Sequence, residues 1–141
     1  QKPAVWKAAF GVMAAPPPKD KAVFLHCDFL PVNMLWSRER ITGLTDWNGI
    51  HQGSRAIDVG HCRRYLAALY SPEWSEQLRS LYESIAGVTL DPWWDLYALL
   101  HYDDSGPKWI RSQVAGRRPV DVPGMTSRVE VAIGTALRRL G

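Results

Sequence analysis

The sequence predicts an α+β fold that is mainly α, with a small β element followed by a helical bundle. Three short apolar runs separated by loops lie between residues 22 and 45, whereas from about residue 58 apolar residues recur at helical spacing. The chain has 141 residues, of which 46% are hydrophobic and 22% are charged. This composition is typical of a single folded domain and excludes a disordered or collagen-like chain.

The first part of the chain is predicted to form one helix and three strands. Residues 4–15 are rich in alanine and carry an apolar stripe, which favours a helix, and the three prolines at 16–18 end it. A charged turn at 37–40 separates the second strand from the third. The strands are predicted at 22–26, 34–36 and 41–45.

The second part of the chain is predicted to be helical. Apolar residues follow a helical period from about Asp58, are interrupted at Pro72 and continue to Gly87, which is a typical residue after a helix end. Asp91 followed by Pro92 predicts the start of another helix. The remaining predictions are a loop at 103–108, an irregular stretch at 115–124 and a final amphipathic helix at 127–140.

Charge and hydropathy exclude several functional classes. The 17 Lys and Arg against 14 Asp and Glu give a net charge of +3, which is too small to predict nucleic-acid binding. No run approaches the ~20 apolar residues of a membrane span, and no basic-then-apolar stretch precedes a small-residue cleavage site, so we expect no secretory leader. Cys27 and Cys62 are too few for a disulfide scaffold. We therefore expect a cytoplasmic protein that binds neither nucleic acid nor membrane.

Polar residues capable of chemistry follow the predicted strands. His26, Asp28 and Asn33 occur together in HCDFLPVN, and Asp46 follows the third strand. Strands would hold these residues rigidly while their side chains emerge at loop positions. Asp28 could accept a proton from a substrate hydroxyl, and the oxygens of Asn33 and Asp46 are hard ligands suited to Mg²⁺.

The spacing His-x-Asp-x₄-Asn is that of the protein-kinase catalytic loop, and the next strand is followed by Asp-Trp-Asn where kinases have Asp-Phe-Gly. The run FLHCDFLPVNMLWSRERITGLTDWNGIHQGSRAID resembles the aminoglycoside phosphotransferase and choline kinase-like family. LYESIAGVTLDPWWDLYALL is similar to the helical part of that family, so that the resemblance covers most of residues 22–100. It implies the C-terminal lobe of a protein-kinase-like fold, in which a small β-hairpin element carries the catalytic loop.

The resemblance implies a role for each of five residues. Asp28 would be the catalytic base that orients the hydroxyl, and Asn33 and Asp46 would be the metal ligands that bridge to nucleotide phosphates. His26 would support the catalytic loop from behind. Asp58, in RAIDVG, would be a buried structural acid at a helix start.

The same resemblance implies the partners of the reaction. Mg²⁺ would be the cofactor, and ATP or GTP would donate the γ-phosphate to a hydroxylated small molecule. That molecule could be cationic, as an aminoglycoside is, which would connect the protein with antibiotic resistance. Asp91, Asp95, Asp103 and Asp104 could attract such a polyamine, or they could be a solvated helix start and loop. The aromatic residues of the helical part could form a cage for a cation, or they could be core.

The sequence departs from the family pattern in two ways. Cys27 stands where the loop usually has glycine, which costs on the order of 1 kcal/mol if that backbone needs a positive φ. The sequence also contains no Gly-x-Gly-x-x-Gly and no strand lysine before the loop. We therefore expect residues 1–141 to be the C-terminal lobe, with the catalytic loop and the substrate site, and the N-terminal nucleotide-binding lobe to be absent from the chain.

Two further expectations follow from an absent lobe. The isolated chain could be inactive, so the alternative function is a non-catalytic module that binds a substrate or a partner. The face that the lobe would cover should be apolar, so a second copy of the chain could pack against it as a homodimer. Phosphorylated product from the chain would favour the enzyme, and binding without nucleotide hydrolysis would favour the module.

Overall fold

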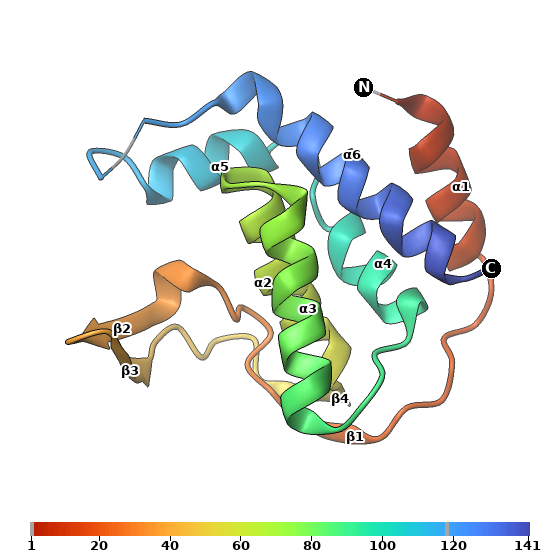
Figure 1. Cartoon of the computed structure of the whole chain (residues 1–141), viewed down its shortest axis with the longest axis horizontal. Helices are drawn as coiled ribbons and strands as arrows, with labels where there is room; N and C mark the ends of the chain where they lie inside the picture. Colours follow the sequence, from red (N-terminus) through yellow and green to blue (C-terminus); the bar gives the residue numbers. More distant parts are fainter. Residues whose placement is uncertain (1, 118) are drawn as a thin grey trace.

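Helices make up most of the protein, and its strands form two separate two-stranded sheets (Figure 1). The structure is a computed structural model that describes residues 2–117 and 119–141. The predicted α+β class, mainly α, is confirmed. In chain order the elements are α1 (Pro3–Met13), β1 (Ala22–Leu25), the 3₁₀ helix η1 (Pro31–Asn33), β2 (Met34–Ser37), β3 (Arg40–Leu44), β4 (His51–Ser54), α2 (Arg55–Leu69), α3 (Pro72–Ala86), α4 (Pro92–Leu100), α5 (Gly106–Gln113) and α6 (Val122–Arg139).

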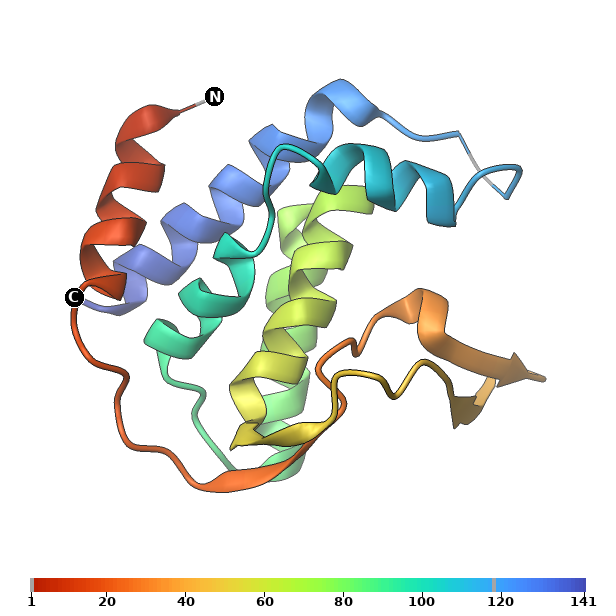
Figure 2. The same ribbon diagram turned by 180° about the vertical axis from the view of Figure 1, so that it is seen from behind.

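The three predicted strands are confirmed as β1, β2 and β3. β2 and β3 form an antiparallel hairpin with Ser37 opposite Arg40, and Arg38 and Glu39 turn the chain with φ angles of 47° and 65°. This two-residue turn with both φ angles positive matches the right-handed twist of the strands. The hairpin projects away from the helices (Figures 1 and 2).

β4 was not predicted, because its sequence HQGS has no apolar alternation. It becomes a strand by antiparallel pairing with β1, where Leu25 lies opposite His51 and Ala22 lies opposite Ser54. The pairing places the start of β1 next to Ser54, the residue before α2. Ser54 caps α2, since its Oγ accepts a hydrogen bond from Ala56 N at 3.2 Å.

α2 is the central helix, and it packs against α3, α4 and α6, while α1 lies along α6 and α4 (Figure 2). The core formed there is fully buried at Leu96, Leu99, Met125, Val129 and Ile133. Among the described residues no helix is both long enough and apolar enough to cross a membrane. Leu30, in the loop that follows β1, belongs to the same core, so the helices support that loop.

Helix ends agree with several of the predicted capping signals. Gly87 adopts a left-handed conformation with φ of 63° directly after α3, and the Asp91 side chain accepts a hydrogen bond from Trp93 N at 2.8 Å at the start of α4. The predicted loop at 103–108 is wrong for its last three residues, because α5 already begins at Gly106. Ile110 of α5 is buried in the main core, so packing against the other helices favours a helix at this position.

The final helix starts earlier than predicted. α6 begins at Val122, because the Asp121 carboxylate accepts a hydrogen bond from Gly124 N at 3.1 Å and Pro123 fits the first helical turn. The predicted irregular stretch is therefore wrong for residues 122–124. Residue 118, within that stretch, lies outside the described residues.

A network of buried charges joins four helices. Arg63 of α2 is fully buried, pairs with Asp95 of α4 and Glu76 of α3, and donates from Nε to the Ser75 carbonyl oxygen at 2.9 Å. Arg139 of α6 contributes a second cation, with its Nη1 3.3 Å from Asp95 Oδ2. The network ties α2, α3, α4 and α6 together by charge as well as by apolar packing.

Candidate active site

The loop after β1 is closed by a hydrogen bond between Asp28 and Asn33. Asn33 Nδ2 donates to Asp28 Oδ2 at 2.7 Å and to the Asp28 carbonyl oxygen at 2.8 Å. The loop can close over this spacing because Pro31 begins a single 3₁₀ turn, in which Asn33 N donates to Leu30 O at 2.9 Å. Both bonds are made by the amide nitrogen of Asn33, and within residues 2–117 and 119–141 its Oδ1 accepts no hydrogen bond.

His26 connects this loop to the segment after β3. Its Nδ1 accepts a hydrogen bond from Asp28 N at 3.2 Å, and its Nε2 lies 2.9 Å from the Thr45 carbonyl oxygen. Both contacts are satisfied by the neutral tautomer that carries its proton on Nε2. The His26 ring is 3% exposed and lies 4.4 Å, centroid to centroid, from the ring of Trp47. His26 therefore holds the loop from the interior side.

A backbone hydrogen bond next to Asp46 holds this residue near the loop after β1. The preceding residue, Thr45, donates its N–H to the Asn33 carbonyl oxygen at 2.9 Å. Asp46 itself has a φ of 63° and an exposed carboxylate, and its Oδ1 accepts a hydrogen bond from Asn48 Nδ2 at 2.7 Å. The backbone of Asn33 therefore anchors the residue before Asp46, while Asp46 Oδ2 has no hydrogen-bond partner among the described residues.

Asp58 reaches the loop from α2. Its two carboxylate oxygens accept the backbone N–H groups of His26, at 2.8 Å, and Cys27, at 2.7 Å. The residue lies at the fourth position of α2 and is half-buried, while the helix cap itself is Ser54. Asp58 thus fixes the two residues before Asp28 to the central helix.

Cys27 has the positive φ that glycine would accommodate, with a value of 64°. Its Sγ lies 3.1 Å from Nδ1 of His51 on β4. Burial, together with the negative charge of Asp58, raises the pKa of the Cys27 thiol to about 11. The thiol therefore stays protonated at neutral pH and is not a nucleophile there.

The side-chain oxygens of Asn33 and Asp46 are of the type that Mg²⁺ takes as ligands in proteins. Asn33 Oδ1 and Asp46 Oδ2 are both hard oxygens left free by the contacts of their side chains. In the described part of the chain, no group of three or more His, Cys, Asp and Glu residues could hold a metal ion. A site built on one amide and one carboxylate is consistent with Mg²⁺ in phosphoryl-transfer proteins, which takes few protein ligands.

A cavity of about 360 Å³ lies beside Asp28, and sequence reasoning did not find it. Its walls come from the loop, α2, the end of α4 and α5, and include His61, Arg64, Asp103 and Trp109. Arg64 is half-buried, and burial lowers its pKa while the negative charges of Asp28 and Asp103 raise it. The residues that form this cavity are far apart in the sequence, so no local pattern signals it.

Four acidic residues that could attract a polyamine, Asp91, Asp95, Asp103 and Asp104, do not gather into one cluster. Asp91 caps α4, Asp95 belongs to the buried charge network, and Asp103 lines the cavity beside Asp28. Asp103 also lines a second cavity together with Asp104, and Asp28 does not border that one. The four carboxylates therefore do not form a single site, and the attraction of a polyamine stays a prediction.

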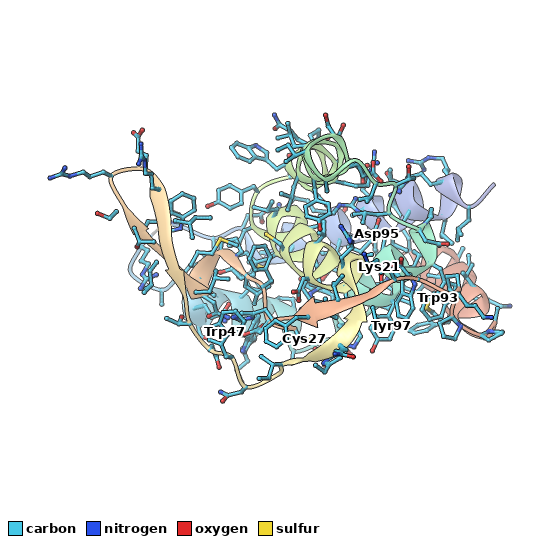
Figure 3. The ribbon with its side chains drawn as sticks, turned by 90° about the horizontal axis from the view of Figure 1, so that it is seen from below. Lys21, Cys27, Trp47, Trp93, Asp95 and Tyr97 are labelled. Carbon is cyan, nitrogen blue, oxygen red and sulfur yellow. The ribbon has the colours of Figure 1, made fainter. Side chains whose placement is uncertain are left out.

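The aromatic residues do not form a single cage either. On α4, Trp93 stacks on Tyr97 with ring centroids 6.0 Å apart (Figure 3). Trp74 lies on α3, and its ring centroid is 5.7 Å from that of Tyr70, the residue after α2. Trp47, labelled in another part of the same view (Figure 3), has its ring centroid 4.4 Å from that of His26. Only Trp109, of the tryptophans, reaches the cavity beside Asp28.

Comparison with known proteins agrees with the geometry of the loop. The model of the phosphotransferase enzyme family, APH, matches residues 1–93 of the 141 in the chain. The match includes His26, Asp28, Asn33, Asp46 and Asp58. No curated protein and no solved structure gives a significant match. Because the family model covers well over half of the sequence, the chain belongs to the phosphotransferase enzyme family.

Proposed function

We propose that residues 1–141 form the catalytic-loop and substrate-binding lobe of a kinase-like phosphotransferase. The lobe would transfer the γ-phosphoryl group of ATP or GTP to a hydroxyl of a small molecule. The observation that carries the proposal is the pair of hydrogen bonds from Asn33 Nδ2 to Asp28. The carbonyl oxygen of Asn33 also accepts a hydrogen bond from the backbone N–H of Thr45, the residue before Asp46. This arrangement supports one shared site for Asp28, Asn33 and Asp46.

Asp28 acts on the substrate hydroxyl. Its Oδ2 is occupied by Asn33, so Oδ1 is the oxygen available to a hydroxyl in the adjacent cavity. Asp28 would orient that hydroxyl and accept its proton as the oxygen attacks phosphorus. Asp58 and His26 keep the loop in position, since they bind its backbone from α2 and from the interior.

Asn33 and Asp46 would hold Mg²⁺ against the nucleotide phosphates. The ion, when bound, would neutralise charge on the transferring phosphoryl group. The sequence holds no Gly-x-Gly-x-x-Gly to cover those phosphates. We propose that a nucleotide-binding lobe from outside residues 1–141 supplies this cover.

The test is phosphoryl transfer in the protein that carries this lobe and its nucleotide-binding part. Asp28→Ala should reduce the turnover of radiolabelled ATP or GTP with hydroxylated acceptors by about 10²–10⁴-fold, as expected for loss of a positioned base. Asp104→Ala is the matched control, because that acid is exposed and lies outside the loop. Wild-type turnover by Asp28→Ala would remove Asp28 from the mechanism.

The metal role and the alternative function are tested by two further measurements. Calorimetry of Asp46→Ala should show loss of Mg²⁺-dependent nucleotide binding, and unchanged binding would contradict the metal role. If the wild-type protein binds a hydroxylated acceptor but never transfers phosphate, it is the non-catalytic binding module derived from the same fold.

A further inference from the structure

An apolar cavity of about 350 Å³ lies between β1 and the helices α2 and α3, and the proposed reaction gives it no role. We call it the β1–α3 cavity. Its apolar walls include Val23 of β1, Phe29 of the loop after β1, Val59 of α2 and Leu78 of α3, and Asp28 does not border it. Both the volume and the mainly apolar lining are typical of small-molecule sites.

The β1–α3 cavity extends from the surface to the core. Leu25 and Val59 in its walls are only 1% and 5% exposed, whereas Phe24 in the same walls is 65% exposed. A ligand in the cavity would therefore cover apolar surface that water now contacts, and burial of such surface is favourable. This arrangement favours a ligand with an apolar part.

Two charged residues, Arg55 and Asp58, also line the β1–α3 cavity. The Asp58 carboxylate already accepts the backbone N–H groups of His26 and Cys27, at 2.8 Å and 2.7 Å. Arg55, the first residue of α2, is half-buried, and its guanidinium makes no hydrogen bond or ion pair with any described residue. A guanidinium only donates and matches the two oxygens of a carboxylate, so a carboxylate complements the unpaired charge.

We propose that the β1–α3 cavity binds a small amphipathic carboxylate of the fatty-acid class. Its alkyl chain packs against Val59 and Leu78, and its carboxylate pairs with Arg55 at the start of α2. The inference goes beyond the proposed function, because this cavity is separate from the one beside Asp28 and needs neither nucleotide nor acceptor.

The experiment compares four ligands by calorimetry with the 141-residue chain, without nucleotide and below the concentration at which the ligands form micelles. Octanoate should bind most tightly. Hexanoate, with two methylenes fewer, should bind about 15-fold more weakly if the chain is buried. Octanol, which lacks the charge, should bind about fivefold more weakly than octanoate. Octylammonium should bind more weakly still, because it places a second cation beside Arg55.

One pair of variants tests the charge. Arg55→Gln should weaken octanoate binding by about fivefold and leave octanol binding unchanged, because only the carboxylate uses the guanidinium. Arg111→Gln is the matched control, since it removes the same charge from the wall of another cavity.

A second pair of variants tests the apolar wall. Leu78→Glu places a carboxylate inside the β1–α3 cavity and should abolish the binding of both octanoate and octanol. Leu81→Glu makes the same change on the same helix at a position that is 52% exposed and does not line the cavity, so it should leave binding unchanged. Thermal unfolding establishes that each variant is folded.

Four results would overturn the proposal: no binding of octanoate, equal affinity for octanoate and hexanoate, octylammonium binding as tightly as octanoate, or unchanged octanoate binding by folded Leu78→Glu. If Leu78→Glu does not fold, the four ligands and Arg55→Gln decide the question. Failure of the proposed function is distinguishable, since a protein that binds octanoate through Arg55 but transfers no phosphate keeps this inference and loses the other.

Discussion

Cys27 carries backbone strain in the loop after β1. Its φ of 64° places an L side chain in the left-handed region, and its Cβ lies close to the backbone of the turn after Asp46, where a Cβ added at Gly49 would approach it to 3.1 Å. The side chain contacts His51, so the loop gains one contact in exchange for the strain. The two N–H groups that Asp58 binds keep this conformation in place.

We expect Cys27→Gly to unfold at a higher urea concentration than Cys27→Ala. Both variants lose the contact with His51, but only alanine keeps a Cβ at a positive φ, which costs about 1 kcal/mol. The free energy of unfolding should therefore differ by about that amount between the two variants. Equal stabilities would show that the loop relaxes around a Cβ without cost.

His61 should make the fold sensitive to acid. Its pKa is lowered from 6.5 to about 3 in the folded protein, so between these values the unfolded chain binds a proton that the folded chain does not. Stability must then fall as the pH falls through this window, by about 2–3 kcal/mol at a pH near 4.5. Urea unfolding of wild type and of His61→Gln, at a pH above 6.5 and at a pH near 4.5, measures this loss of stability. Equal losses in the two proteins would contradict the assignment of the effect to His61.

At the scale of elements, the helices are held together by charge inside the protein. Arg63 is fully buried and Asp95 is 2% exposed, and each has a partner of opposite sign. A buried pair of this kind contributes little net stability compared with apolar residues, but an unpaired member is costly. The network therefore matters for which helices lie together more than for how stable they are.

Arg63→Met should destabilise the protein by about 3–5 kcal/mol, because Asp95 then keeps only its longer contact with Arg139. The double variant Arg63→Met/Asp95→Leu should recover much of that loss, since neither buried charge remains. Thermal unfolding of the single and double variants measures the difference. A double variant as unstable as the single one would mean that packing around the side chains, not the charge, dominates.

At the scale of the molecule, the projecting β2–β3 hairpin is an apolar surface. Leu35, Trp36 and Ile41 are 52%, 59% and 49% exposed, and Trp36 lies opposite Ile41 across the two strands. The exposed hairpin gives the 141-residue chain a surface on which a second copy could pack.

We expect the 141-residue chain to self-associate through this hairpin. Sedimentation velocity should show a mass that rises with concentration, and Trp36→Ser/Ile41→Ser should shift the protein to monomer. Ile85→Ser is the control, because Ile85 is 86% exposed on α3, away from the hairpin. A chain that stays monomeric at all concentrations would contradict this expectation, and equal effects of the two changes would place the contact elsewhere.

The sequence by itself determined the elements and the identities of the loop residues. Apolar runs and capping residues are local signals, so the first three strands, the helix end at Gly87 and the start at Asp91 followed from short windows. The proximity of Asp28 and Asn33 could also be predicted from their spacing, because a single 3₁₀ turn between them is enough to bring the two side chains together. The roles of these residues in catalysis remain predictions.

The tertiary structure alone decided what lies around that loop. β4 forms only because β1 pairs with it, and the apolar spacing on α3 leaves Trp74, Leu81 and Ile85 largely exposed. The cavity that combines Asp28 with His61 and Trp109 needs three segments brought together from distant parts of the chain. Local sequence patterns carry no information on such contacts, because these arise from packing between elements.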